Sequence, residues 1–179
     1  MLIHINSWPG AGKKTIGQIL AKAIGARFFH NHLLLDLVES CCERDDPGWQ
    51  PLYDDVRSRA YETLAGKARG ESLVLTNAMA SGEMPLWSKI SDLAARRGDD
   101  LVPVVLHISP PENRRRLEDP ARIGAKLKSA AVLESLRASH ALLVPVHPHL
   151  FEMDISDMSA SDAALRISQH LDGLSRRAV

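Results

Sequence analysis

The chain lacks an excess of charge of either sign. Its 22 Lys and Arg residues are balanced by 22 Asp and Glu residues, so the formal net charge is zero. A protein that binds nucleic acid over a whole face is usually strongly basic. The balance argues against nucleic acid as a partner, although it leaves room for a local basic patch.

Cysteine is scarce, and long apolar runs are missing from the sequence. Cys41 and Cys42 are adjacent, and one neighbouring pair cannot build a disulfide framework. Two free thiols are typical of a reducing compartment. No stretch approaches the ~20 apolar residues that a membrane span needs, and the first residues do not read as a signal peptide. We therefore expect a cytoplasmic protein without a membrane partner.

Short apolar segments alternate with segments of helical periodicity along all 179 residues. The segments expected to be strands are residues 2–6, 26–32, 72–77, 101–109 and 150–156. Apolar residues recur at helical spacing in residues 16–24, 33–43, 52–69, 86–97, 130–139 and 160–175. Strands that are nearly all apolar and separated by helices predict a parallel sheet covered on both faces. The sequence thus predicts one α/β domain over residues 1–179.

A glycine-rich turn, SWPGAGKKT (residues 7–15), lies between the first strand and the first helix. It matches the phosphate-binding P-loop pattern G-x-x-x-x-G-K-[ST] from Ser7 to Lys14. The nucleotide contacts are expected from one continuous run: Pro9, Gly10, Ala11, Gly12, Lys13, Lys14 and Thr15. Glycines let main-chain N–H groups curl around phosphate oxygens, and the helix N-terminus adds a positive dipole end. The lysine at position 13 supplies a charge for the β- and γ-phosphates.

The turn departs from the pattern at two positions. Ser7 replaces the first glycine, which is tolerated where that residue keeps ordinary dihedral angles. Lys14 replaces the residue whose hydroxyl normally binds Mg²⁺, and an ammonium group cannot coordinate a cation. Thr15 is about 100° further around the helix and is the remaining candidate ligand. The pattern therefore predicts nucleotide binding and leaves the mode of Mg²⁺ binding open.

The segment HINSWPGAGKKTIGQILAKAIG (residues 4–25) resembles the N-terminus of small P-loop kinases of metabolites and nucleotides. Shikimate, gluconate and adenylate kinases and chloramphenicol phosphotransferases form this group. The loop is most similar to that of uncharacterised bacterial AAA family ATPase or shikimate-kinase-like proteins. The resemblance implies a P-loop NTPase fold with a five-stranded parallel sheet. It also implies ATP and Mg²⁺ as cofactors, an acceptor site after the second and third strands, and a basic lid.

Residues at the ends of the second and third strands are the candidate acceptor site. The second strand runs into His30, Asn31 and His32, and Asp36 follows one helical turn later. Open α/β sheets bind ligands at the carboxyl ends of their strands. Either His32 or Asp36 can act as the base that accepts a hydroxyl proton. Asn31, His32 and Asn77, at the end of the third strand, are expected to contact the acceptor.

The segment 109–129 is strongly basic, and the resemblance places the lid there, at about residues 110–129. Its cations are Arg114, Arg115, Arg116, Arg122, Lys126 and Lys128. In this family the corresponding arginines neutralise charge on the transferred phosphoryl group. Adjacent arginines point about 100° apart on a helix, so few of them can face one site. We expect Arg115 and Arg122 to do so, although a solvated basic helix is the alternative.

These features lead to one functional hypothesis and three alternatives. The leading hypothesis is an ATP-dependent kinase that phosphorylates a hydroxyl group of a small molecule. A nucleotide or nucleoside kinase differs only in its acceptor. A nucleotide-binding switch without transfer activity is suggested by the missing hydroxyl at Lys14 and the missing acid beside Asn77. A GTPase is disfavoured because no N-K-x-D guanine signature follows the fourth strand. The sequence does not indicate an oligomeric state.

Overall fold

The computed structural model describes residues 1–66, 70–119 and 129–177. Its centre is a five-stranded sheet in the order β2-β3-β1-β4-β5, and every neighbouring pair is parallel. The strands are β1 (Leu2–Asn6), β2 (Arg27–His30), β3 (Leu73–Asn77), β4 (Leu101–His107) and β5 (Phe151–Asp154). The predicted all-parallel α/β sheet is therefore confirmed.

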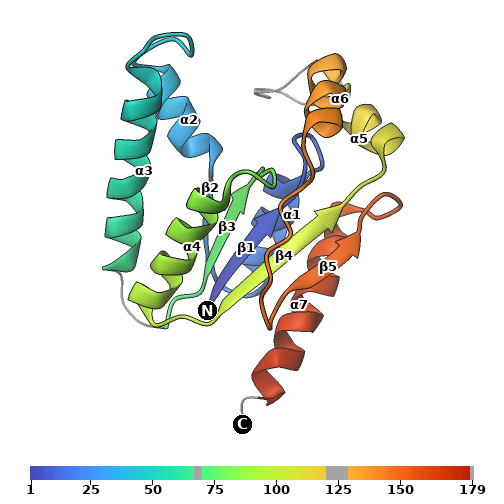
Figure 1. The fold of residues 1–179 in the computed structure, drawn as a ribbon. Coiled ribbons are helices and arrows are strands. Elements are labelled where there is room, and N and C mark those ends of the chain that lie inside the picture. The colour runs from blue at the N-terminus through green and yellow to red at the C-terminus, as the bar shows by residue number, and fades with distance from the viewer. Residues whose placement is uncertain (67–69, 120–128, 178–179) are drawn as a thin grey trace.

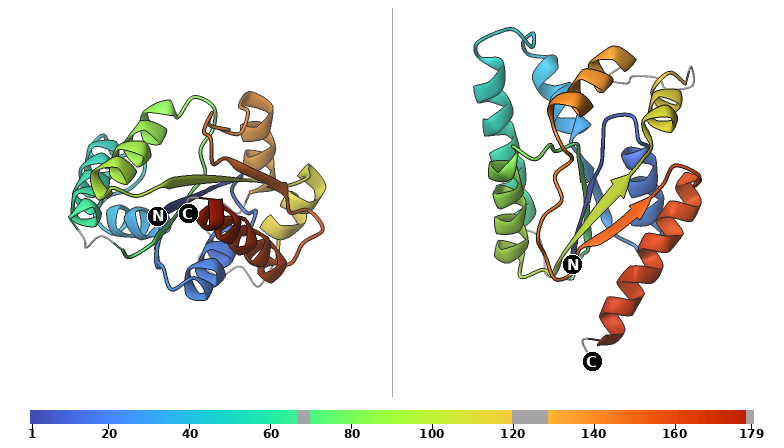
Figure 2. Two further views of the ribbon diagram at one scale, coloured as in Figure 1. Left: turned by 90° about the horizontal axis from the view of Figure 1, so that it is seen from below. Right: turned by 45° about the vertical axis from the view of Figure 1, so that its right-hand side comes forward.

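Helices cover both faces of this sheet, so the fold has three layers (Figures 1 and 2). The helices are α1 (Lys13–Ala23), α2 (His32–Glu39), α3 (Trp49–Ala65), α4 (Met84–Arg97), α5 (Pro110–Leu117), α6 (Ala130–Ser139) and α7 (Ala160–Arg177). Helices α1 and α7 lie on one face, and α3 and α4 lie on the other (Figure 2). Helices α2, α5 and α6 stand above the carboxyl ends of the strands (Figure 1).

Side chains of the central strand, β1, belong to two separate hydrophobic clusters, one on each face of the sheet. Ile3 and Ile5 of β1 belong to the cluster that contains the buried residues of α1 and α7. Leu2, on the opposite face, belongs to the cluster with Tyr61 of α3 and Ile90 of α4. This is the pattern expected when a strand is buried on both sides. The buried central strand fixes the position of the turn that follows it.

The main boundary error concerns α3, which was expected to begin at residue 52. The helix begins at Trp49 and contains Pro51 within its first turn. Proline is tolerated there because the first N–H groups of a helix have no intrahelical partner. Trp49, Tyr53 and Arg57 are consequently spaced by four residues on one helix and share a face.

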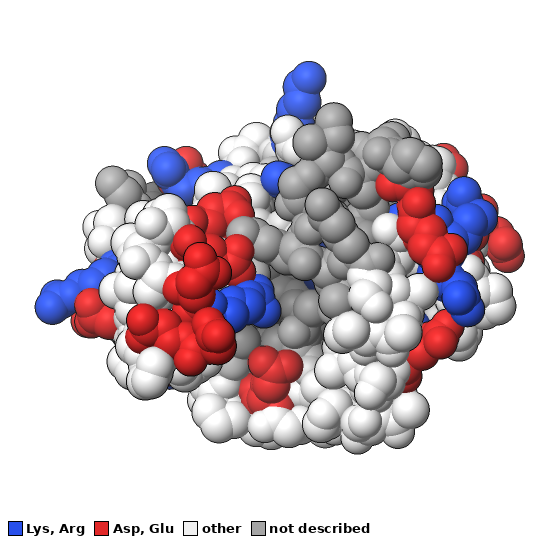
Figure 3. All heavy atoms as spheres, turned by 90° about the horizontal axis from the view of Figure 1, so that it is seen from above, with Lys and Arg blue, Asp and Glu red and all other residues white. Residues whose placement is uncertain are grey.

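The surface of the described residues carries mixed charge. Figure 3 looks down onto the carboxyl edge of the sheet, where Asp and Glu side chains gather on the side of α2 and α3. Basic and acidic groups alternate on the opposite side, so this view shows no continuous basic face over the described residues. Cys41 and Cys42 are free thiols in the turn after α2. Within the described part of the chain, every helix is too short or too polar to cross a bilayer.

Candidate functional site

The turn between β1 and α1 has the backbone geometry of a phosphate-binding loop. Gly10 and Gly12 have φ angles of 82° and 101°, values that L-residues with side chains rarely adopt. Ser7 has no such strain, because no described non-glycine residue has a positive φ. The Ser7 hydroxyl is fully buried and donates to the carbonyl of Leu106 at 2.7 Å. Serine at the first position of the loop therefore ties the loop to β4.

Lys13 is the first residue of α1, and its side chain folds back against the loop. Its Nζ donates to the main-chain carbonyls of Ser7 and Trp8, at 3.0 and 2.8 Å. Main-chain N–H groups in the first turn of α1 lack intrahelical acceptors, as at any helix start. The loop thus combines an ammonium group, main-chain amide donors and a helix N-terminus, a combination that is suited to bind an anion.

Helices α5 and α6 hold the outer side of the loop in place. Asn113, which is fully buried, donates to the carbonyl of Pro9 at 2.9 Å and accepts from Arg137 at 3.0 Å. Arg116 donates to the carbonyl of Ala11 at 3.0 Å. The Arg137 guanidinium lies 5.1 Å from the centre of the Trp8 ring. The conformation of the loop is therefore fixed by residues more than 100 positions away in the sequence.

A cleft of about 560 Å³ opens beside this loop. Gly10, Gly12, Lys13 and Lys14 line one side of it. Residues from β2, α2, β3, α3, α4 and the adjoining turns line most of the remainder, and Val132 and Leu136 of α6 contribute apolar surface. The cleft lies where the resemblance predicts the nucleotide and its acceptor to meet.

The protein ligands expected for Mg²⁺ do not come together here. Lys14 lines the cleft, whereas Thr15 is exposed and lies outside its lining. Glu83 is the single carboxylate among the lining residues, and its Oε2 accepts from the N–H of Ala80 at 2.7 Å. The described residues contain no group of three or more His, Cys, Asp or Glu side chains able to hold a metal ion. They therefore do not fit a protein-held Mg²⁺ site.

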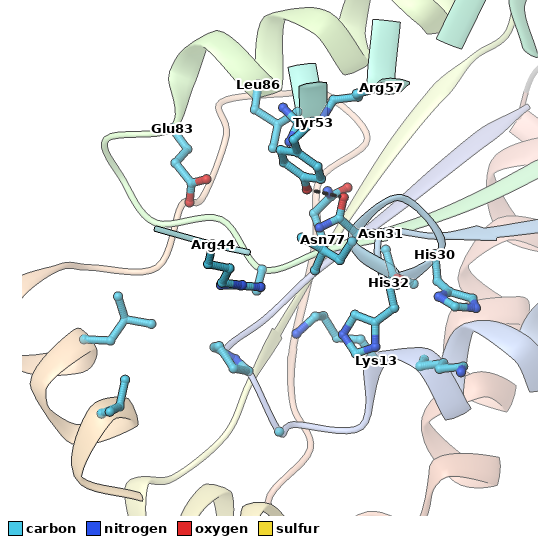
Figure 4. Close-up of a pocket in the computed structure, with 18 of the residues that line it drawn as sticks. Lys13, His30, Asn31, His32, Arg44, Tyr53, Arg57, Asn77, Glu83 and Leu86 are labelled. Atoms are coloured by element: carbon cyan, nitrogen blue, oxygen red, sulfur yellow. Dashed lines mark hydrogen bonds between the residues drawn. The ribbon is translucent and has the colours of Figure 1, made fainter. Parts of the chain in front are cut away.

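The predicted acceptor residues do come together. Asn31, His32 and Asn77 all line the cleft, and they extend into it from the ends of two strands (Figure 4). Asn31 accepts a hydrogen bond from the Tyr53 hydroxyl at 2.8 Å. Asn77 is buried, and its Oδ1 lies 3.2 Å from Nε2 of His4. Two cleft-lining amides are thus oriented by side chains from other elements.

His30 also lines the cleft, and its imidazole is biased strongly toward the neutral form. Burial, helped by the charges of Lys14 and His32, lowers the pKa of His30 to about 4. The Asp36 carboxylate acts in the opposite direction. Asp36 itself is exposed on α2 and lies outside the cleft lining. Of the two predicted bases, His32 is therefore the one that faces the cleft.

One wall of the cleft, built by α3 and the turn before it, was not predicted from the sequence. Trp49 and Tyr53 are stacked with ring centres 4.9 Å apart. The Arg44 guanidinium lies 5.3 Å from the centre of the Trp49 ring, and Arg57 lies 4.2 Å from that of Tyr53. All four residues line the cleft. The spacing of residues 49, 53 and 57 could have revealed this face, had the helix start been placed correctly.

Arg115, one of the two predicted lid arginines, is not among the described residues that line the cleft. Arg115 forms a two-pronged ion pair with Glu112, at 2.6 and 2.7 Å, and its side chain is 69% exposed. Arg116 also donates to this carboxylate, at 2.7 Å. The hydrogen bonds from the two arginines lower the pKa of Glu112 to about 2. Arg122 lies outside the described residues. The roles predicted for Arg115 and Arg122 stay predictions.

Known proteins resemble this chain in structure. No family model and no curated protein sequence matches it. A proposed kinase from Chloroflexus aurantiacus is 18% identical, with a TM-score of 0.72 and 96% of each chain covered. An APS kinase from Mycobacterium tuberculosis, solved with AMPPNP and APS, is 15% identical, with a TM-score of 0.63 and 96% of each chain covered. A shikimate kinase from Acinetobacter baumannii, solved with shikimate, is 16% identical with a TM-score of 0.59, covering 96% of this chain and 93% of that one. The chain therefore has the fold of the small P-loop kinases.

Proposed function

We propose that this protein is an ATP-dependent phosphotransferase that acts on a hydroxyl group of a small molecule. The observation that carries the proposal is the meeting of Lys13 and His32 in one cleft. Lys13 belongs to the phosphate-binding loop, and His32 follows the neighbouring strand β2. A phosphate donor and a hydroxyl acceptor bound to these two groups would be brought together.

The nucleotide side of the proposal rests on the loop from Pro9 to Thr15. Its main-chain N–H groups and Lys13 would surround the β- and γ-phosphates of ATP. The positive φ angles of Gly10 and Gly12 support this role, because they turn the backbone in the manner that an anion cradle needs. Binding of Mg²⁺ together with ATP is implied only by the resemblance to the kinases.

The acceptor side rests on Asn31, His32 and Asn77. The acceptor oxygen attacks the γ-phosphorus of ATP, and the bond from that phosphorus to the β–γ bridging oxygen breaks. ADP leaves, and the hydroxyl proton passes to a ring nitrogen of His32. Asn31 and Asn77 orient the acceptor through their amide groups. Phosphoryl transfer depends mainly on positioning and charge, so one imidazole is a sufficient base.

The proposal is tested by ATP consumption in the presence of a panel of hydroxyl-bearing metabolites. At least one acceptor should increase ADP production well above the rate with water alone. Lys13→Ala should abolish this activity, whereas Lys22→Ala, an exposed position on the same helix, should retain it. Activity that survives in Lys13→Ala would contradict the assigned phosphate-binding residues.

A nucleotide-binding switch without phosphotransfer is the second candidate. Two observations favour it: Lys14 occupies the position of the usual Mg²⁺-binding hydroxyl, and β3 ends in Asn77 instead of an acid. A switch would bind ATP and ADP but would give no acceptor-stimulated ADP production. The same assay, combined with a binding measurement, separates the two candidates. A nucleoside or nucleotide kinase would be recognised by its acceptor in the panel.

A further inference from the structure

Lys14 brings an ammonium group to the cleft at the position where a P-loop usually carries a hydroxyl group. It is the second residue of α1 and follows Lys13 directly. Lys14 forms no hydrogen bond or ion pair with any residue in the described part of the chain. Burial is the main cause that lowers the pKa of His30 to about 4, and the charge of Lys14 is the next. The ammonium group therefore lies close enough to the end of β2 to influence a group that lines the cleft.

The side-chain oxygens that could support a divalent cation near Lys14 are engaged by the protein. Asn77 ends β3, where P-loop proteins commonly carry an acid for the cation. Its Oδ1 lies 3.2 Å from Nε2 of His4, which donates because an amide oxygen can only accept. Glu83, the single carboxylate among the described lining residues, accepts from the N–H of Ala80 through Oε2. Mg²⁺ requires an octahedral set of oxygens, usually with one or two carboxylates, so at most one carboxylate oxygen of the lining is left for it.

The charge of the loop also disfavours a second cation. Lys13 and Lys14 are consecutive, and both line the cleft. Like charges repel each other more strongly where water is partly excluded, so a Mg²⁺ ion beside Lys14 would be destabilised. A triphosphate chain carries the opposite charge and would be attracted by both lysines. The loop is therefore better suited to a polyphosphate alone than to a polyphosphate with a bound metal ion.

We infer that this protein binds ATP in its metal-free form, with the ammonium group of Lys14 against the β- and γ-phosphates in the place of Mg²⁺. A lysine side chain is a compact cation on a flexible four-carbon stem, so its charge can reach the phosphate oxygens. Its hydrogen bonds to them are charge-assisted and belong to the stronger class. During transfer the same group would stabilise the charge left on ADP. That role rests on the proposed phosphotransferase function, whereas metal-free binding can be tested without it.

Calorimetric titration of the full chain with ATP in two buffers tests this inference. One buffer contains EDTA and the other contains Mg²⁺ in excess over ATP, at the same ionic strength. The unmodified protein should bind ATP in EDTA at least as tightly as with Mg²⁺, because the metal neutralises the phosphate charge that Lys14 would contact. Tighter binding with Mg²⁺ would overturn the inference and leave the proposed phosphotransferase standing.

Two variants assign the effect to the Lys14 side chain, which is exposed and can be changed without disturbing the core. Lys14→Gln removes the charge and should raise the dissociation constant of ATP in EDTA about tenfold or more, because a charge-assisted hydrogen bond is lost. Lys14→Thr supplies the usual hydroxyl and should bind ATP more tightly with Mg²⁺ than in EDTA. Lys22→Gln is the matched control, since this exposed lysine is in the last turn of the same helix. Equal dissociation constants in EDTA for Lys14→Gln and the unmodified protein would overturn the role of Lys14.

Turnover in the same two buffers separates this inference from the proposed function. ADP production is measured with the panel of hydroxyl-bearing metabolites, and acceptor-stimulated turnover in EDTA would support both proposals. Tight binding of ATP in EDTA without turnover in either buffer would overturn the phosphotransferase and leave metal-free binding standing. Absence of ATP binding by the unmodified protein in both buffers would overturn both.

Discussion

The hydroxyl of Tyr53 donates a 2.8 Å hydrogen bond to Oδ1 of Asn31 (Figure 4). Tyr53 belongs to α3, and Asn31 lies in the turn after β2. This bond fixes the acceptor oxygen of the Asn31 amide and leaves its NH₂ group to donate toward the cleft. Helix α3 therefore orients a residue that we propose to bind the acceptor, in addition to lining the cleft.

Removal of this hydroxyl should impair acceptor use selectively. Tyr53→Phe should lower kcat/KM for the acceptor about two- to tenfold, because a net hydrogen bond contributes roughly 0.5–1.5 kcal/mol. The KM for ATP should change little. Tyr61→Phe is the control, since this buried tyrosine is on the same helix and lies outside the cleft lining. Steady-state kinetics in which both variants behave alike would contradict the positioning role.

Adjacent arginines of α5 should have different effects on stability. Arg116 donates to the carbonyls of Ala11, Ile155 and Met158 and pairs with Glu112. Arg116→Ala should destabilise the fold by roughly 2–4 kcal/mol, because buried carbonyl acceptors lose their donor. Arg115→Ala should change stability by less than about 0.5 kcal/mol, since its ion pair is exposed.

Thermal unfolding compares the two variants directly. At roughly 2–4 °C per kcal/mol for a chain of this size, Arg116→Ala should lower the Tm by about 4–16 °C. Arg115→Ala should leave the Tm nearly unchanged and should reduce turnover if this residue acts in the lid. Equal Tm values for the two variants would show that Arg116 does not hold the phosphate-binding loop.

Stability should fall as the pH decreases below neutrality because of His4. Burial lowers the pKa of His4 from 6.5 to about 4, and its hydrogen bond to Asn77 opposes the shift. Between these pH values the unfolded chain binds the proton and the folded protein does not, so acid favours unfolding. The contribution present above pH 6.5 is lost progressively as the pH falls toward 4.

Urea unfolding at pH 7 and pH 5 measures this effect. The His4 contribution should make the unmodified protein roughly 2 kcal/mol less stable at pH 5 than at pH 7. His4→Gln should show a smaller difference between the two pH values, whereas His140→Gln, at an exposed position, should retain it. An unchanged pH dependence in His4→Gln would contradict the assignment.

Lys14 should control the protonation of His30. The positive charge of Lys14 is one of the causes that lower the pKa of His30 to about 4. Lys14→Met removes this charge and should therefore raise the pKa of His30. Lys22→Met, in the last turn of the same helix, should not. Titration of the imidazole signals by NMR measures both values, and an unchanged pKa in Lys14→Met would exclude close approach of the two groups.

The fold could be predicted because the features that indicate it lie within short, continuous stretches of sequence. Buried strands such as β1 are continuous apolar runs, and the loop containing Gly10, Gly12 and Lys13 lies directly after it. The α3 wall was not predicted, because the helix was expected to begin at residue 52, directly after Pro51, although proline is compatible with the first turn of a helix. Burial of Arg57 depends on tertiary packing, and arginine is rarely buried, so its burial could not be predicted from the sequence.

The sequence also did not reveal that Arg115 is exposed whereas Arg116 packs against the loop. Helical geometry separates adjacent residues by about 100°, but it does not reveal which direction faces the core. That direction is set by carbonyl groups of Ala11 and Ile155, which are brought beside α5 only in the folded chain. Asn31, His32 and Asn77 could be predicted as neighbours because strands of a parallel sheet end at the same edge.

Calorimetric titration of the unmodified protein and Lys13→Ala with ATP, each with and without Mg²⁺, tests the central claim most directly. The account predicts that the unmodified protein binds ATP and that Lys13→Ala binds it at least tenfold more weakly while keeping the same circular dichroism spectrum. Absence of ATP binding by the unmodified protein, or equal binding by the variant, would contradict the assignment of residues 7–15 as a nucleotide-binding loop.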